Sequence, residues 1–375
     1  MIAGILSFVI WYLLTGDLST ATERLVTVLV IACPHALGLA IPLVVSRSTS
    51  LASSQGLLVR NRLALEQANK IDTLALDKTG TLTEGNFTIN EYTNDDILQK
   101  AASIEQYSKH PLARSIVSLA KQKQLQLWKA SNVQNVAGSG IQGRINGHVI
   151  GVFSAKYLQE KGFKIDLAKF NQAATTSFIV EDEKVIGHIS QGDKIRPESK
   201  QMVTGLKELG LSPVMLTGDG RIAAASVADN IGINDFHYQL LPADKENIIA
   251  QYQKDNKKVA MVGDGINDAP SLTRADLGIA IGAGTDIAID SADVILIKSN
   301  PLDIINFFKL AKASSRKMTE NLWWGAGYNL FAIPLAAGLL APIGIVLSPA
   351  AGAILMALST VIVSINALTL KKLTT

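Results

Sequence analysis

The chain has 375 residues, of which 48% are hydrophobic, and its formal net charge is only +3. This length is enough for two or three domains, and so weak a charge gives no reason to expect nucleic acid as a partner. Cys33 is the single cysteine, so an internal disulfide is excluded.

The apolar residues are concentrated toward the two ends of the chain. No Asp, Glu, Lys or Arg occurs from Leu25 to Ser46, and none occurs from Asn321 to Leu370. A helix over the first stretch would reach about 33 Å, enough to cross a bilayer core. The second stretch fits two spans, with turn residues at Ala341–Gly344 and Ser348–Pro349 between them.

The segment Met1–Leu14 is apolar but short. A signal peptide is the alternative, but the segment lacks a basic start and a small-residue cleavage pattern before Asp17, so we favour a membrane helix. Lys and Arg flank the apolar stretches, which predicts that these flanks are cytoplasmic. We expect a multi-pass membrane protein with four spans, in the cell membrane, with large cytoplasmic domains.

Between these stretches, apolar strands lead into acidic loops at Asp77, Asp219 and Asp264, a pattern typical of a parallel α/β sheet. The middle of the region differs. Asn146-Gly147 is a hairpin signal, and another charged turn occurs at Glu181–Lys184. We therefore predict a smaller α+β domain inserted between two halves of one α/β domain.

Two helices are expected in this inserted domain. They cover Asp95–Gln106 and Pro111–Lys123, the second with proline in its first turn.

Asp77 opens the run D-K-T-G-T directly after the apolar stretch Ile71–Leu76. A carboxylate at the carboxyl end of a buried strand lies where open α/β sheets bind and transform ligands. Such a carboxylate can attack a terminal phosphoryl group and hold it as an acyl phosphate. Lys78 and Thr79 add the charge and the hydroxyl that phosphate binding needs. An ordinary polar turn is the less favoured alternative.

A second acidic loop, G-D-G-I-N-D-A-P, begins at Gly263. Asp264 together with Asp77 would give hard oxygen ligands for Mg²⁺ beside a phosphate. The loop Thr217-Gly218-Asp219 is of the same kind, and its hydroxyl could hold a phosphoryl oxygen. Taken alone, each loop could be a plain strand-to-helix turn.

The three loops, in this order and flanked by apolar stretches, resemble those of the P-type ATPases, which are ion pumps. The resemblance covers nearly the whole chain. It implies membrane α-helical spans plus an α/β haloacid-dehalogenase-like phosphorylation domain with an inserted α+β nucleotide-binding domain. It also implies that ATP phosphorylates Asp77, and that Asp264 and the main chain of Thr79 join Asp77 in binding Mg²⁺. Further members of this site are implied at Lys78, Thr217, Gly218, Asp219, Lys245, Asn267 and Asp268.

The inserted domain carries Glu105, His110-Pro111 and Gly138-Ser139-Gly140. A His-Pro at a helix start is more often a cap than a ligand site, and a lone Gly-x-Gly is weak. In heavy-metal P-type pumps, however, such a set surrounds the adenine nucleotide. The resemblance therefore implies nucleotide binding at Glu105, His110, Gly138 and Gly140.

Asp193 and Arg196 resemble the hinge motif of this family, with Asp193 beside the nucleotide. A surface ion pair is the alternative. The predicted domains are a transmembrane hairpin at 1–47, a discontinuous phosphorylation domain at 48–87 and 188–300, a nucleotide-binding domain at 88–187, and a helical extension with two transmembrane helices at 301–375.

Cys33-Pro34-His35 lies within the first apolar stretch. Residues two apart on an ideal helix point about 200° away from each other, so the thiol and imidazole could not share one ion. Pro34 removes an amide hydrogen and crowds a carbonyl, so the helix should open and let them converge. Thiolate and imidazole suit Cu⁺, Cu²⁺, Ag⁺ or Zn²⁺. A proline kink with a packed Cys33 is the alternative.

A Cys-Pro-His motif resembles that of copper and silver exporters, which implies that Cu⁺, Cu²⁺ or Ag⁺ is transported. Further ion contacts are expected at Asn329 and Met356, with Tyr328, Ser359 and Thr360 behind them. Packing and helix–helix hydrogen bonds are the alternatives for these residues.

P-type ATPases also have an actuator domain with a Thr-Gly-Glu loop, and no Thr-Gly-Glu occurs here. We expect an amino-terminally truncated pump that accepts phosphate at Asp77 but releases it slowly, with a complementing fragment carrying the actuator as a possible partner. Two alternatives stay open. A phosphatase of the haloacid-dehalogenase type would commonly have an acid where Thr79 stands. A split-pump remnant would bind metal and nucleotide without transport.

Overall fold

The computed structural model describes residues 1–33, 35–108, 110–136, 139–166, 174–264, 267–282 and 290–371, leaving aside the side chains of 35–37, 86 and 111. These residues form two compact units. The first unit comprises Met1–Ile71, Asp293–Lys298 and Asp303–Thr375, and the second comprises Asp72–Ala292 and Ser299–Leu302.

The first unit is mainly helical. Its elements are α1 (Ile2–Thr15), α2 (Leu18–Ile31), α3 (His35–Ser54), α4 (Ala64–Ala68), α13 (Leu302–Gly327), α14 (Asn329–Ala336) and α15 (Pro349–Leu368), with a 3-10 turn at Ala341–Ile343 and the antiparallel strands β1 (Leu57–Val59) and β13 (Val294–Leu296). Gly16 ends α1 in the left-handed conformation, and the Asp17 carboxylate caps α2 by accepting from the amides of Ser19 and Thr20.

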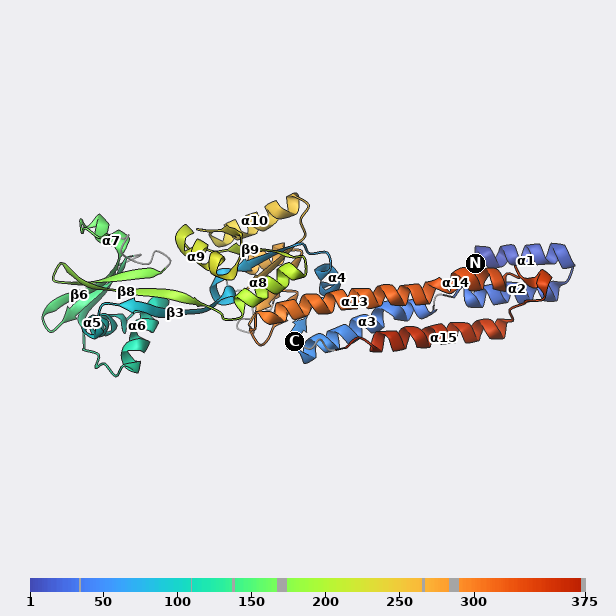
Figure 1. Cartoon of the computed structure of the whole chain (residues 1–375), viewed down its shortest axis with the longest axis horizontal. Helices are drawn as coiled ribbons and strands as arrows, with labels where there is room; N and C mark the ends of the chain where they lie inside the picture. Colours follow the sequence, from blue (N-terminus) through green and yellow to red (C-terminus); the bar gives the residue numbers. More distant parts are fainter. Residues whose placement is uncertain are drawn as a thin grey trace. The chain divides into compact units, whose positions relative to one another are not determined.

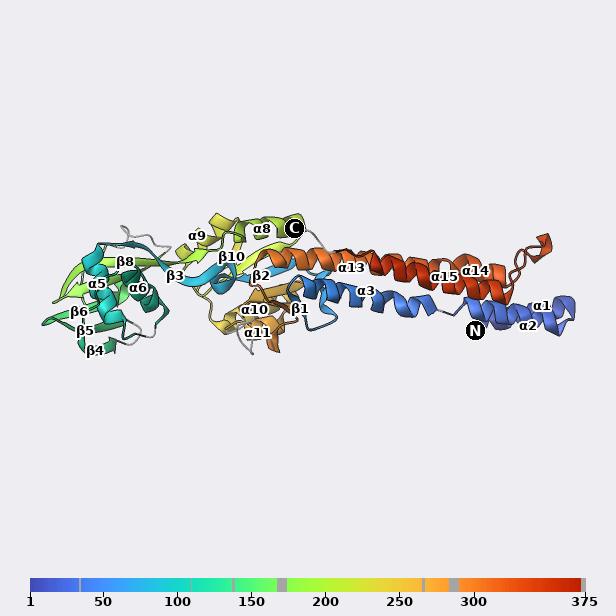
Figure 2. The ribbon, with the colours of Figure 1, turned by 90° about the horizontal axis from the view of Figure 1, so that it is seen from below.

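Helices α3, α13 and α15 run alongside one another (Figures 1 and 2). Val44, Met318 and Ala367 form one apolar contact among the three. The hydroxyls of Ser48 and Ser314 share a buried hydrogen bond of 2.6 Å, so α3 and α13 are also joined by polar groups.

Among the described residues, one helix, Pro349–Leu368, is long and apolar enough to cross a membrane, and Ile2–Thr15 is apolar but shorter. Within Leu25–Ser46, α2 ends at Ile31 and α3 begins at His35. Pro34 itself lies outside the described residues, but the interruption falls where the proline was expected to open the helix. Four spans therefore remain a proposal.

The second unit contains a parallel sheet with neighbouring strands in the order β12-β11-β2-β9-β10. The strands are β2 (Thr73–Asp77), β9 (Ser212–Leu216), β10 (Asp235–His237), β11 (Val259–Gly263) and β12 (Leu277–Ile281), and the helices around them are α8 (Ser199–Glu208), α9 (Arg221–Ile231), α10 (Pro242–Lys254) and α11 (Ala269–Arg274). Ile249 of α10 and Leu272 of α11 pack on Ala75 and Met261, so these helices cover one face.

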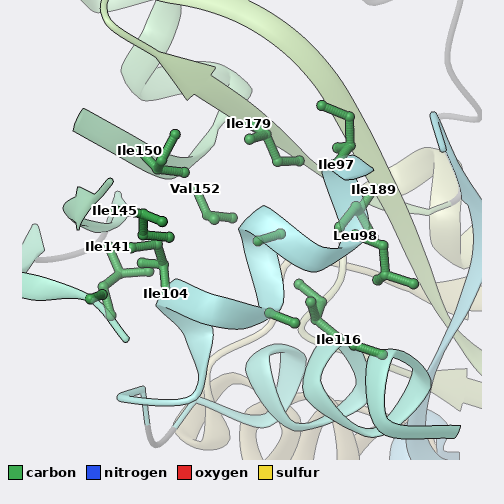
Figure 3. Close-up of a cluster of buried hydrophobic side chains, with 14 residues drawn as sticks. Ile97, Leu98, Ile104, Ile116, Ile141, Ile145, Ile150, Val152, Ile179 and Ile189 are labelled. Atoms are coloured by element: carbon green, nitrogen blue, oxygen red, sulfur yellow. The ribbon is translucent and has the colours of Figure 1, made fainter. Parts of the chain in front are cut away.

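A second sheet of this unit is antiparallel, in the order β3-β8-β7-β6-β5-β4. Its strands are β3 (Thr83–Tyr92), β4 (Ser131–Val136), β5 (Gly140–Ile145), β6 (His148–Ser154), β7 (Thr175–Glu181) and β8 (Lys184–Ile195), and its helices are α5 (Asp95–Glu105), α6 (Pro111–Gln122) and α7 (Ala155–Glu160). Figure 3 shows its main core, where α5 and α6 pack on alternate residues of the strands.

Most predicted elements of the inserted domain are confirmed. Helices α5 and α6 match their expected ranges to within one residue at the end, and Asn146 and Gly147 turn between β5 and β6 with φ of 50° and 89°. The expected domain boundaries at 87/88 and 187/188 fall inside β3 and β8. The domain division therefore stays a proposal.

Candidate phosphorylation and nucleotide sites

Parallel pairing brings the predicted catalytic loops to one edge of the sheet. Strands β2, β9 and β11 end at Asp77, Leu216 and Gly263, and Asp77 lies opposite Leu216 in the strand register. The residues that follow these strand ends therefore gather at the carboxyl edge, where α/β sheets place their active sites.

A buried lysine links two of these loops. Lys245 Nζ lies 2.5 Å from Asp77 Oδ1 and 2.7 Å from Asp268 Oδ1. All three side chains are buried, and Asp77 is only 5% exposed. Lys245 lies in the first turn of α10, which begins at Pro242. The structure thus joins Asp77, Lys245 and Asp268 in one cluster.

Burial raises the pKa of Asp77 to about 7, and the nearby Asp268 and Asp264 carboxylates add to this rise while Lys245 opposes it. Burial alone would lower the pKa of Lys245, but the two aspartates outweigh it and raise that pKa. The lysine therefore stays charged and favours the ionised, nucleophilic form of Asp77.

Two glycines allow the loops to come close. A Cβ on Gly263 would lie 2.4 Å from Asp268 Oδ2, and Gly80, at φ 75°, has Asp264 Oδ2 3.4 Å from its Cβ position. The Asp264 and Asp268 carboxylates both lie close enough to raise the pKa of Asp77, so three carboxylates gather at this edge of the sheet.

These hard carboxylate oxygen atoms fit Mg²⁺. In the described ranges no group of three or more His, Cys, Asp or Glu side chains is arranged to hold a metal. A magnesium ion here would therefore rely on Asp77, Asp264, the main-chain carbonyl of Thr79, and water. Bound there, it would neutralise phosphate charge during transfer.

The remaining loop residues surround this cluster. Lys78 is buried and paired with Asp219. Thr217 is buried, and its hydroxyl accepts from the Asp219 amide at 3.1 Å. Gly218 is exposed between them, while Asn267 is exposed and Thr79 projects outward. None of these positions conflicts with phosphate binding.

The predicted hinge residues contact the D-K-T-G-T loop and the residues just after it. Arg196 donates through Nε to the Thr83 carbonyl and through Nη2 to the Gly80 carbonyl, both at 3.0 Å. Asp193 accepts from the Thr83 hydroxyl at 2.5 Å. Ser199 donates to the Leu82 carbonyl at 2.7 Å, a contact that the sequence did not suggest because no motif marks it.

The predicted nucleotide residues line one cavity of about 410 Å³ in the inserted domain. Glu105, His110 and Gly140 all border it, whereas Gly138 lies outside the described residues. Asp193 does not border it. Several other residues that no motif marks also line the cavity, among them Ser108, Asn135, Phe153, Ser154, Thr175, Thr176 and Ser177.

Three of the predicted nucleotide residues, Glu105, Gly140 and His110, have local surroundings that account for their residue type. Burial raises the pKa of Glu105 to about 7, with a hydrogen bond from Ser108 opposing the rise. Gly140 has φ 152°, and a Cβ there would lie 2.0 Å from the Val152 carbonyl oxygen, so only glycine fits. His110 caps α6 by accepting the Leu112 amide at Nδ1.

Among the expected ion contacts, Cys33 is exposed as a free thiol, and the His35 side chain lies outside the description. Asn329 Oδ1 and Ser359 Oγ are buried and have no hydrogen-bond partner among the described residues. Met356 is half-buried on α15. Unpartnered buried oxygens are costly, so two of them on the apolar helices α14 and α15 fit an ion or substrate pathway.

A family model described as haloacid dehalogenase-like hydrolase matches residues 71–276, more than half of the chain. The chain belongs to this family. The strand-end aspartate Asp77 lies near the start of the matched region.

Curated relatives of this haloacid dehalogenase-like chain support the narrower resemblance. A probable copper-transporting P-type ATPase B of Staphylococcus epidermidis is 55% identical over 98% of this chain and 56% of its own length. The copper-exporting P-type ATPase B of Enterococcus hirae is 52% identical over 99% of this chain and 51% of its own length. The copper-exporting P-type ATPase B of Archaeoglobus fulgidus is 46% identical over 97% of this chain and 54% of its own length. The chain thus spans about half the length of the curated relatives it matches.

Solved structures agree with this picture. A zinc-transporting PIB-type ATPase in the E2.Pi state matches with a TM-score of 0.84, 29% identity, and coverage of 98% of this chain and 61% of that one. The catalytic domain of the CPx-ATPase CopB-B, from a structure that describes conformational changes upon nucleotide binding, matches with a TM-score of 0.59 and 29% identity. The match covers 68% of this chain and 96% of that domain. The resemblance to heavy-metal P-type ATPases and the fold class are confirmed. These comparisons give no support to a separate complementing fragment.

Proposed function

We propose that this chain provides the phosphorylation site, the nucleotide site and part of the ion path of an ATP-driven copper or silver transporter. The observation that carries the proposal is the buried cluster of Asp77, Lys245 and Asp268 at the carboxyl edge of the parallel sheet. Asp77 attacks the terminal phosphoryl group of ATP, and Lys245 stabilises the charge that develops during transfer.

The nucleotide binds in the inserted domain, in the cavity bordered by Glu105, His110 and Gly140. Because His110 Nδ1 accepts the Leu112 amide, the neutral ring carries its proton on Nε2 and can donate it to the ligand. Gly138 and Asp193 complete the proposed set, with Asp193 acting at the hinge.

The transported ion is Cu⁺, Cu²⁺ or Ag⁺, held by Cys33 and His35 with Asn329 and Met356. The soft thiol and imidazole support this choice of ion, and the copper-exporting relatives support export as the direction. The protein would then lie in the cell membrane as a multi-pass chain, with the phosphorylation and nucleotide sites in the cytoplasm. Mg²⁺ is the proposed cofactor.

Phosphate labelling tests this function. The purified chain is incubated with radiolabelled Mg-ATP, with and without Cu⁺ or Ag⁺. We expect label on wild type, none on Asp77→Asn, and loss of the metal response in Cys33→Ser. Label that persists in Asp77→Asn would reject the proposal.

Two other functions are separated by the same assay. A haloacid-dehalogenase-type phosphatase would hydrolyse small phosphate esters with Mg²⁺ alone, without needing ATP, Cu⁺ or Ag⁺, but Thr79 occupies the position of its usual second acid. A remnant without transport would bind copper and ADP yet show no label at Asp77.

A further inference from the structure

Gln191, near the end of strand β8, makes contacts that a buried strand position does not require. The residue is 0% exposed. Its Nε2 donates to the Leu112 carbonyl at 2.8 Å and to the Ser115 hydroxyl at 2.5 Å. Both partners belong to the first turns of α6, so one strand side chain holds the start of this helix.

The carbonyl oxygen of the same amide differs from its NH₂ group. Gln191 Oε1 is buried and accepts no hydrogen bond from any residue that the structure describes. The amide cannot be turned around, because the Leu112 carbonyl only accepts and must face the NH₂ group. An unpartnered acceptor weakens the fold, so an apolar side chain would suit stability better here. The retention of a polar side chain here therefore favours a role for Gln191 in the nucleotide cavity.

The turn that Gln191 holds is the one that orients His110. The Leu112 amide donates to His110 Nδ1 at 3.3 Å, while the Leu112 carbonyl receives Gln191 and, at 2.9 Å, the Ser115 hydroxyl. The backbone of Leu112 is therefore held on both sides. Its amide fixes the ring direction of His110, which lines the nucleotide cavity together with Leu112 itself.

We propose that Gln191 is a positioning residue that, through Leu112, holds the His110 imidazole in the orientation that binds the nucleotide. This inference rests on the proposed nucleotide function of the cavity. Gln191 acts through His110, so its effect should appear in nucleotide affinity and disappear when the imidazole is absent.

The first test compares affinity with stability. Gln191→Met keeps the side-chain length but removes the amide, and the Leu112 carbonyl keeps its bond from Ser115. We expect the Kd for ADP of the full chain in detergent to rise about tenfold, with an unchanged or higher thermal midpoint. Gln99→Met is the control, because it removes a similar amide-to-carbonyl bond, 2.7 Å to Gln126, away from the start of α6. Its Kd should stay at the wild-type value.

The second test is a double-mutant cycle, since residues that act through one another are not additive. In a His110→Ala background, Gln191→Met should change the Kd by less than about twofold. The same tenfold loss in both backgrounds would overturn the proposal, and so would an unchanged Kd in the single variant. Gln191→Leu repeats the cycle if the methionine variant does not fold.

The outcome also separates this inference from the function on which it rests. A wild-type chain that binds ADP but tolerates Gln191→Met overturns the positioning role alone. A wild-type chain that binds no ADP overturns both proposals.

Discussion

Lys245 Nζ lies 2.5 Å from Asp77 Oδ1, and both side chains are buried. The ammonium group is the one cation in direct contact with the nucleophile among the described residues, and it also contacts Asp268. The chemistry of the phosphorylation site should therefore depend on this lysine more than on any of the exposed loop residues.

Lys245→Met removes that cation. We expect phosphorylation of Asp77 to slow roughly 100-fold, because a preorganised donor to the transferring phosphate is lost. The thermal midpoint should also fall, since two buried carboxylates are left without their partner. The rate of label incorporation and differential scanning fluorimetry measure these effects. Lys207→Met is the control, because Lys207 is an exposed helix cap that donates to the Gly232 carbonyl. Equal labelling by both variants would contradict the prediction.

Arg196→Lys tests the hinge. The guanidinium donates to the carbonyls of both Gly80 and Thr83, and a lysine cannot reproduce this fork. We expect label incorporation at Asp77 to drop about tenfold, while the Kd for ADP stays within about twofold. Arg114→Lys, at an exposed position on α6, should alter neither quantity. If ADP affinity and label incorporation fell by the same factor, Arg196 would stabilise the fold as a whole and would not act on the loop at Asp77 specifically.

Glu105 should make stability depend on pH. Burial raises the pKa of this acid to about 7 in the folded state from its usual 4.5. The folded protein therefore holds the proton more tightly, so the contribution of Glu105 to stability is complete below about pH 4.5 and is lost as the pH rises to about 7. The loss is at most about 3 kcal/mol.

Glu105→Gln removes this titration. The thermal midpoint of the variant relative to wild type should rise between pH 5 and pH 8, as followed by scanning fluorimetry in matched buffers. Glu160→Gln, an exposed position at the end of α7, serves as the control. A constant difference between the Glu105 variant and wild type over this range would contradict the assigned burial effect.

Ser359 and Ser364 offer a matched pair on α15. Ser359 Oγ is buried without a partner among the described residues, whereas Ser364 donates to the Thr360 carbonyl at 2.8 Å. We expect Ser359→Ala to weaken Cu⁺ binding several-fold without lowering stability, because it removes an orphan acceptor. Ser364→Ala should leave metal affinity unchanged. A Cu⁺ competition titration with a chromophoric chelator measures both, and equal affinities would place Ser359 outside the ion path.

The gathering of the acidic loops at one edge of the sheet was predictable for a physical reason. Asp77, Asp219 and Asp264 each follow a short apolar strand, and parallel strands bring such residues together whatever the surrounding detail. Likewise, the hairpin at Asn146-Gly147 was predictable because local backbone preference determines it.

Contacts set by tertiary packing were not predictable in this way. Gln191 and Ser199 hold backbone carbonyls of segments far away in the sequence, and neither lies in a recognisable motif. The pairing of Lys245 with both Asp77 and Asp268 also depends on how α10 meets the strand ends, which periodicity does not encode. The break between α2 and α3 was foreseen at Pro34, but the start of α2 at Leu18, ahead of the charged Arg24, was not.

The central claim, a covalent phosphate on Asp77, is tested most directly by borohydride trapping. Reduction of an aspartyl phosphate converts the residue to homoserine, which mass spectrometry can locate in a peptide. We predict homoserine at position 77 after the chain is treated with Mg-ATP and Cu⁺, and aspartate there when ATP is omitted. The account would be contradicted if position 77 remained aspartate in both samples although the same chain binds ADP.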